Sequence, residues 1–323
     1  MQNGLLIGLG AGVASALLYA SAWTGTAIGL FVLFFLSPMP IAIASLGWGW
    51  AAGGIASAAA FILVTVTGGP RTGFVYLITL AAPAVVFSYL ALLTRAVPSA
   101  DGQEPHIEWY PIGRIVMWAS LWAGLIASAA ILNLGTDASA VRAAVLDLLD
   151  KTVLRNGIGP AGTALTTDEK SSIAAVVAIF LPWMMATTWF AVAMLNLWLA
   201  ARVTLRSGRL PRPWPPLQAI TLPPAMPLVF GAAAIGTLMP DMPGLISSGF
   251  ASALLFAFML VGLGILHRMT LGNAMRPFLL GLVYAGLIFL PPLLNLLVAL
   301  VGLAEPYLRG RLPPPQAPPE LRA

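Results

Sequence analysis

The chain is a series of apolar runs of about twenty residues, separated by short segments that hold nearly all of its charge. A membrane-spanning helix needs about 20 predominantly apolar residues. Only 8% of the 323 residues are charged, against about 25% in soluble domains, and the mean hydropathy is +0.92. These charges are too few to cover a water-exposed surface, which excludes a soluble globule, a disordered chain and a coiled coil. The pattern predicts an all-α, polytopic transmembrane helical bundle.

Eight or nine spans are predicted, because the short run 225–238 lies between prolines and either spans the membrane or is re-entrant. Prolines also interrupt two other runs, at Pro38 and Pro40 and at Pro291 and Pro292. Proline lacks a backbone donor and clashes with the preceding turn, so a break or kink is expected at 37–40. The nine candidate runs are 4–19, a run from 25 into Pro38, 46–67, 74–93, 115–132, 171–200, 225–238, 245–266 and 277–303.

The runs are expected to form a single integral membrane domain over residues 1–304. Residues 305–323 are rich in proline, which predicts a disordered tail. A polar segment at about 136–169 is predicted to lie outside the membrane. Within it, 138–154 has the pattern of an amphipathic helix that is too charged to span, so it lies on the membrane surface or caps the bundle. Thr166 and Glu169 have capping-box spacing ahead of the next span.

Orientation follows from the distribution of lysine and arginine. The strongest cytoplasmic signal is an acid-free segment at 202–212 that would also attract anionic lipid headgroups; its basic residues are Arg202, Arg206, Arg209 and Arg212. Counting back from it places 135–169 outside. Counting forward leaves two alternatives, since nine spans put the tail outside and eight put 267–276 outside. We expect a multi-pass inner-membrane protein whose partners are membrane lipids rather than nucleic acid.

No residue is predicted to be catalytic. The chain has no cysteine and two histidines, and it lacks a phosphate-binding loop, a His-Glu-x-x-His pair and a Gly-x-Ser-x-Gly turn. No charged residue lies near the centre of a predicted span, where proton relays and ion paths are usually marked. Asp241 is interpreted as a loop residue rather than a proton carrier. The chain is therefore predicted to have no metal site and no cofactor, and not to be an enzyme.

Two asparagines lie inside predicted spans, Asn196 and Asn295. A buried amide is unfavourable without a hydrogen-bonding partner, so each either joins helices or contacts a ligand. Trp189 shares a run with Asn196. An aromatic-lined pocket with a few amides suits a neutral or weakly polar small molecule, and the candidate ligand-binding residues are Trp189, Asn196 and Asn295.

A stripe of small residues recurs every fourth position along the first run, where another helix can approach closely. The stripe either packs inside the molecule or docks on a partner subunit. Its members are Gly4, Gly8, Gly12, Ala16 and Ala20.

Several short motifs, taken in order, resemble a known family over most of the chain except the tail. They are Ser-Pro-Met-Pro at 37–40, Leu-Asn-Leu-Trp-Leu at 195–199 ahead of Arg202, Arg-Pro-Trp-Pro-Pro-Leu at 212–217, Pro-Pro at 291–292 and Gly-Leu-Ala-Glu-Pro-Tyr-Leu-Arg at 302–309. In this order they resemble the YybS-like predicted membrane proteins, a bacterial family of unknown function, in its alphaproteobacterial form.

That family is distantly similar to the S-components of energy-coupling factor transporters. S-components bind vitamins or metal ions and dock on a separate coupling subunit with ATPases, using a small-residue stripe on the first helix. The resemblance implies an S-component-like core with extra helices, and a substrate-binding or transport subunit without its own ATPase. The alternative is a structural or assembly protein of the cell envelope with no small-molecule substrate.

Overall fold

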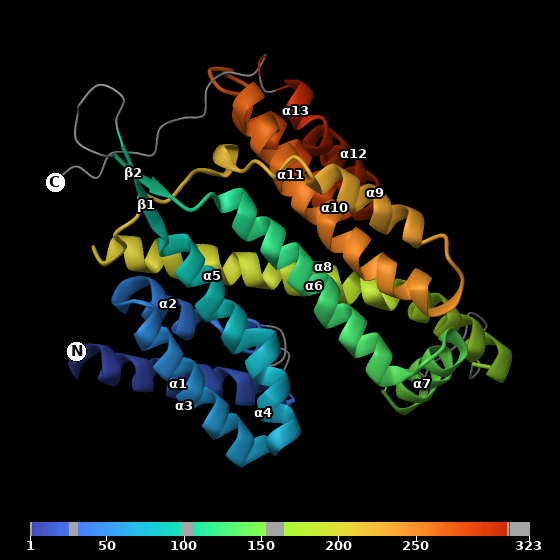
Figure 1. Cartoon of the computed structure of the whole chain (residues 1–323). Coiled ribbons are helices and arrows are strands. Elements are labelled where there is room, and N and C mark those ends of the chain that lie inside the picture. Colours follow the sequence, from blue (N-terminus) through green and yellow to red (C-terminus); the bar gives the residue numbers. More distant parts are fainter. Residues whose placement is uncertain (1, 26–31, 99–105, 153–164, 309, 311–323) are drawn as a thin grey trace.

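The computed structural model describes residues 2–25, 32–98, 106–152, 165–308 and 310, and they are largely helical (Figure 1). In chain order the elements are α1 (Gln2–Ala20), η1 (Ser21–Thr24), α2 (Met39–Trp48), α3 (Trp50–Gly68), α4 (Pro70–Tyr76), the π-helical η3 (Leu77–Ala81), α5 (Ala82–Leu92), β1 (Thr94–Val97), β2 (His106–Trp109), α6 (Ile112–Leu134), α7 (Ala138–Thr152), α8 (Thr167–Arg206), η5 (Leu217–Ala219), α9 (Met226–Gly236), α10 (Asp241–Met269), α11 (Arg276–Phe289), α12 (Pro291–Leu303) and α13 (Glu305–Leu308).

Six helical stretches in the described part of the chain are long and apolar enough to cross a membrane. They are Asn3–Trp23, Trp50–Gly68, Pro70–Leu92, Ile112–Leu134, Thr167–Arg206 and Asp241–Met269. Each overlaps a run expected from the sequence, so the prediction of a polytopic helical bundle is confirmed at this level. The remaining apolar helices, α2, α9, α11 and α12, are shorter than a full span.

The predicted start of the span at 46–67 is wrong, because the chain turns at Gly49 and the long helix begins after it. This glycine has φ of 90°, in the left-handed region that favours glycine, and it separates α2 from α3. The two helices then pack closely, since a Cβ on Gly53 would lie 1.8 Å from Ser45 Oγ. The break expected at 37–40 is confirmed, with α2 beginning at Met39 directly after Pro38.

The ninth predicted run is not one helix but two. Leu290 separates α11 from α12, and neither Pro291 nor Pro292 has an N–H to continue the preceding helix. At 14 and 13 residues, each helix is about 20 Å long against about 30 Å for the hydrocarbon core. The short run at 225–238 likewise contains only the 11 residues of α9.

Helix α8 is the central element of the bundle. Its 40 residues extend about 60 Å, and it contacts α2, α5, α6, α7 and α10. Figure 1 shows it running from the α7 end of the molecule to the end that carries the β-hairpin. The core around it is built from buried side chains of facing helices, including Ile115 of α6, Phe190 of α8 and Ala253 of α10.

The small-residue stripe of α1 packs inside the molecule. A Cβ on Gly8 would meet Ala52 O at 2.7 Å and one on Gly12 would meet Ala56 O at 2.5 Å. The four-residue step is the same on both helices, so α1 and α3 run parallel at close range. Ala16 is also buried, whereas nothing lies within 4 Å of a Cβ on Gly4.

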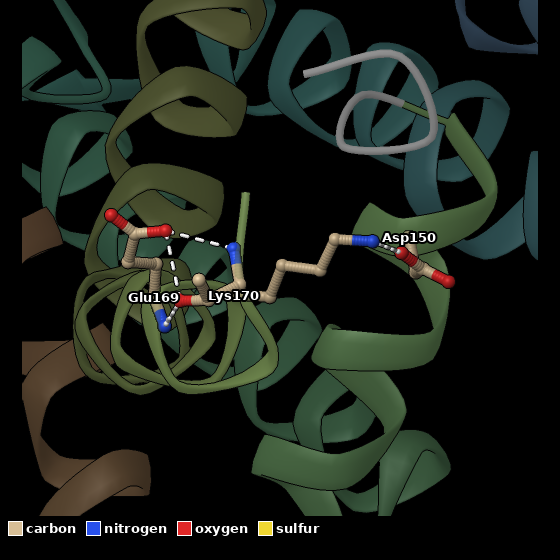
Figure 2. Close-up of polar contacts among 4 residues, drawn as sticks. Asp150, Glu169 and Lys170 are labelled. Atoms are coloured by element: carbon tan, nitrogen blue, oxygen red, sulfur yellow. Dashed lines mark hydrogen bonds and ion pairs between the residues drawn. The ribbon is translucent and has the colours of Figure 1, made fainter. Parts of the chain in front are cut away.

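Helix α7 caps the bundle at the end where α6 and α10 meet α8. Val141 and Val145 are buried against the first turns of α8, while Leu148 at the end of the same apolar face is exposed. An ion pair joins α7 to α8, with Lys170 Nζ 2.5 Å from Asp150 Oδ1 (Figure 2). Thr166 and Glu169 form the predicted capping box at the start of α8. On α7 itself, Asp147 and Lys151 lie one turn apart and form an ion pair at 2.7 Å.

Asp241, the first residue of α10, forms a hydrogen bond with α7. Its carboxylate accepts a hydrogen bond from the backbone N–H of Ala138, the first residue of α7. A second carboxylate, that of Asp137, accepts from Ser139 Oγ and from the N–H of Ala140, and these bonds lower the pKa of Asp137. Asp241 therefore lies at a helix connection and holds α7 in place.

A small antiparallel hairpin between α5 and α6 was not predicted. Strands β1 and β2 pair with Arg95 opposite Glu108, and these side chains form an ion pair at 2.6 Å. At four residues each, the strands are too short to give a clear alternating pattern in the sequence.

The start of the predicted tail belongs to the folded body. Glu305 begins the short helix α13 and is buried, and α13 contacts α10 and α12. The rest of the predicted disordered tail lies outside the described residues, apart from residues 306–308 and 310.

We expect Gly12→Ala to destabilise the protein by about 1–3 kcal/mol, because the added methyl group would overlap the Ala56 carbonyl at the α1–α3 contact. Gly10→Ala on the same helix is the control. Nothing lies within 4 Å of its Cβ, so replacement of a helical glycine should leave stability unchanged or raise it by up to about 1 kcal/mol. Thermal unfolding in detergent micelles measures both, and equal effects of the two changes would contradict the close contact.

Candidate functional site

Two residues expected to contact a ligand lie together on one face of α8. Trp189 and Asn196 are seven residues apart, close to two helical turns, so their side chains point to the same side. Each donates to a backbone carbonyl of another segment: Trp189 Nε1 to Thr79 O at 2.7 Å, and Asn196 Nδ2 to Phe35 O at 2.8 Å. Both carbonyls lack a regular helical partner.

The first irregularity is the π-helical segment η3. Ala82 N donates to Leu77 O, one residue further back than in an α-helix, which leaves the Ile78 carbonyl without its usual donor. Pro83 has no N–H to give to Thr79. Two tryptophans replace the missing donors, Trp122 Nε1 to Ile78 O at 3.2 Å and Trp189 Nε1 to Thr79 O.

The second irregularity is the turn segment 32–38 that precedes α2. Met39 N donates to Leu36 O rather than to Phe35 O, so the Phe35 carbonyl is free to accept from Asn196. Ser37 O accepts from Ser15 Oγ of α1. From Met39, the 10 residues of α2 cover about 15 Å, half of the hydrocarbon thickness, which places the break near mid-depth.

A cavity lies between these two irregular segments and α8. Its volume is ≈ 20 Å³, room for about one water molecule, so a larger ligand requires the walls to move apart. The lining is mainly apolar, with Phe87 lying edge-on to Trp189 at a centroid distance of 6.4 Å. The lining residues used below are Pro38, Thr79, Pro83, Trp189, Ala193 and Asn196.

Asn196 supplies the polar feature of this cavity. It is 3% exposed, and its Nδ2 donates to Phe35 O and to Val192 O, both at 2.8 Å. Its Oδ1 is buried and has no hydrogen-bond partner among the described residues. An acceptor without a donor in an apolar site is unfavourable, so this oxygen can receive an N–H or O–H from a bound molecule. The Trp189 ring offers a flat apolar wall beside it.

The third expected ligand contact, Asn295, is not part of this cavity. It lies half-exposed on α12, which packs against α10 rather than α8. The structure therefore brings Trp189 and Asn196 together but leaves Asn295 apart. Thr79, Pro83 and Phe87 were missed; Pro83, a proline inside an apolar run, was the available signal.

The basic segment 202–212 divides into two parts. Arg202 and Arg206 are exposed on the last turns of α8, and Arg209 lies over the Trp48 ring at 4.6 Å from its centroid. Arg212 instead faces inward: it is 5% exposed, and its guanidinium donates to Ala91 O at 2.8 Å. Ala91 lies in the last turn of α5, where carbonyls lack helical partners. The prediction of a headgroup contact is therefore wrong for Arg212.

Burial lowers the pKa of Arg212 to about 10, so its side chain stays charged at neutral pH. Elsewhere in the described part of the chain, no three histidine, cysteine, aspartate or glutamate side chains gather as a metal ion would require.

Six helical stretches long and apolar enough to cross a membrane define a polytopic helical membrane protein. Residues 13–305 match the model of the family described as predicted membrane protein (DUF2232). The chain belongs to this family. No curated protein and no solved structure matches it.

We expect Arg212→Met to lower stability by about 1–3 kcal/mol, because the buried Ala91 carbonyl would lose its charged donor. Arg206→Met removes the same charge from an exposed position and should leave the free energy of unfolding unchanged. Denaturant unfolding in micelles, followed by circular dichroism, gives both values. Equal losses would show that the charge of the segment, and not the α5 contact, is what stabilises the protein.

Proposed function

We propose that this protein binds a small, mostly apolar molecule with a hydrogen-bond donor beside Trp189 and Asn196, where the cavity widens to admit it, as a substrate-binding subunit for transport. The observation that carries the proposal is the buried Oδ1 of Asn196, a residue of the cavity lining, which has no partner among the described residues. The site shares a feature with transporters, in which substrates bind at interrupted helices near the bilayer midplane.

The neutral character of the molecule follows from the lining. No aspartate, glutamate, lysine or arginine lines the cavity, so a charged ligand would lack a counter-ion in an apolar environment. The Trp189 ring and Phe87 favour a ligand with a flat or branched apolar body. Asn196 Oδ1 then selects for a hydroxyl, amine or amide group on that body.

We also propose that the protein depends on partner proteins for the energy of transport. We infer a place in the bacterial inner membrane, and a coupling subunit with ATPases as in the S-components to which the YybS-like proteins are distantly similar. The proposal assigns no catalytic step to this chain. The α1 stripe does not support docking, because Gly8 and Gly12 pack on α3, and the coupling surface is left to another part of the bundle.

A structural or assembly role in the envelope is the second candidate. One observation favours it: α11 has no buried residue and presents large apolar side chains, Phe278, Leu282 and Ile288 among them, at the periphery. Such a surface suits contact with lipid or with another membrane protein. Under this role the cavity would hold no specific small molecule.

Ala193→Leu tests the first proposal, because it fills the cavity without removing a hydrogen bond made by Trp189 or Asn196. Native mass spectrometry of protein extracted in lipid should show a bound small molecule in the wild type and its loss in this variant. Ala191→Leu, two residues away on α8 and outside the cavity lining, is the control and should retain the molecule. Both variants are first compared with the wild type by thermal unfolding, since an overpacked helix can lose about 1–3 kcal/mol.

Affinity capture of the tagged wild-type protein from membranes tests the partner. Recovery of a membrane subunit together with ATPases supports the transport role. A wild type that carries no small molecule and captures no such subunits would overturn the proposal and leave the structural role.

A further inference from the structure

A second hollow lies at the base of the β-hairpin, at the opposite end of the bundle from α7. Its volume is ≈ 190 Å³, and its lining is more polar than that of the first cavity. The residues that matter here are Arg95, Glu108, Trp109, Tyr110 and Arg114. Nothing in the proposed function uses them.

The hollow lies where two membrane spans end. The span Pro70–Leu92 finishes just before it and Ile112–Leu134 begins just after it. The ends of apolar spans lie at the level of the lipid headgroups, where tryptophan, tyrosine and arginine are enriched. A group bound in this hollow is therefore at headgroup depth.

The charges of the described lining residues add to one positive unit. Arg95 is paired with Glu108 at 2.6 Å, which leaves Arg114 as the uncompensated cation. The Arg114 guanidinium makes no hydrogen bond or ion pair with any described residue, and its carbon lies 5.9 Å from the centroid of the Tyr110 ring. A guanidinium held over an aromatic ring keeps its N–H groups available for a planar or tetrahedral oxyanion.

The walls of the hollow are held in place by neighbouring contacts. Arg212, fixed to Ala91 O, lies over the Trp109 ring at 5.8 Å from its centroid. Tyr110 Oη accepts from Trp118 Nε1 at 3.1 Å. The Trp118 side chain is 46% exposed and lies on α6 within the apolar span, so an apolar surface continues from the hollow toward the membrane interior.

We propose that this hollow binds the phosphodiester headgroup of an anionic phospholipid, with Arg114 as the principal contact, Arg95 as the second, and Trp118 beside an acyl chain. The oxyanion chemistry alone would also fit inorganic phosphate. The position at the ends of two spans and the apolar surface below favour the lipid. A phosphodiester with an uncharged head, as in phosphatidylglycerol, matches the single positive charge of the lining.

Native mass spectrometry of the protein in detergent, titrated with phosphatidylglycerol or with phosphatidylcholine, tests the site. The wild type should retain one phosphatidylglycerol per chain in preference to phosphatidylcholine. Arg114→Gln should reduce this retention about fivefold, the effect of about 1 kcal/mol per basic residue near anionic lipid. Glu108→Gln should increase it, because this change neutralises the acid that the described part of the lining contains.

Arg206→Gln is the matched control. It removes the same charge from α8 at the end of the bundle that carries the hairpin, but it does not line the hollow, so retention should be unchanged. Unfolding temperatures of all variants establish that they are folded, as expected for exposed side chains.

Three results would overturn the proposal. They are an equal loss in Arg206→Gln, which would indicate diffuse attraction; equal retention of phosphatidylcholine; and displacement of phosphatidylglycerol by millimolar inorganic phosphate, which would assign the hollow to a soluble ion. None of these bears on the cavity at Asn196, because the variants lie outside its lining.

Discussion

The structure depends on one constraint: inside a hydrocarbon layer, each backbone N–H and C=O must find its partner within the protein. Two irregular segments next to prolines, the π-helical η3 before Pro83 and the turn that contains Pro38, leave carbonyls free that a regular helix would have satisfied. Side chains from other helices supply the donors, Trp122 from α6 and Trp189 and Asn196 from α8. The positions of these three side chains are therefore set by where Pro38 and Pro83 interrupt the helical ladder.

The same constraint explains why a polar atom is left over. An asparagine amide carries two donors and one acceptor oxygen, and the two donors of Asn196 are used on Phe35 O and Val192 O. A serine or a tryptophan at this position would bring no amide carbonyl oxygen. By repairing a backbone defect with an asparagine, the fold places a carbonyl oxygen beside an apolar cavity, and the proposed binding role follows from that oxygen.

Much of the fold could be predicted from local sequence, because apolar length and proline position act over a few residues. The long spans, the break before Met39, the capping box at Thr166 and the α7 cap were of this kind. Gly49 was missed, since its neighbours favour a continuous helix and only the packing of Ser45 on Gly53 requires the turn. Asn196 and Phe35 are 161 positions apart, and no periodicity reports such a pairing. For the same reason the sequence could not separate Asn295 from Trp189, or show that Arg212 faces inward.

Pro182 gives α8 a point at which the long helix can bend. A proline inside a helix removes one hydrogen bond and permits a kink, and Pro182 is buried seven residues before Trp189. The stretch from Pro182 to Arg206 is therefore one stiff rod, about 36 Å long, with a joint at one end. It carries Trp189 and Asn196 of the cavity lining and ends at the exposed Arg202 and Arg206. A tilt of about 5° at Pro182 would displace the far end by about 3 Å. A movement of the cavity wall would therefore be accompanied by a movement of the exposed arginines at the end of α8.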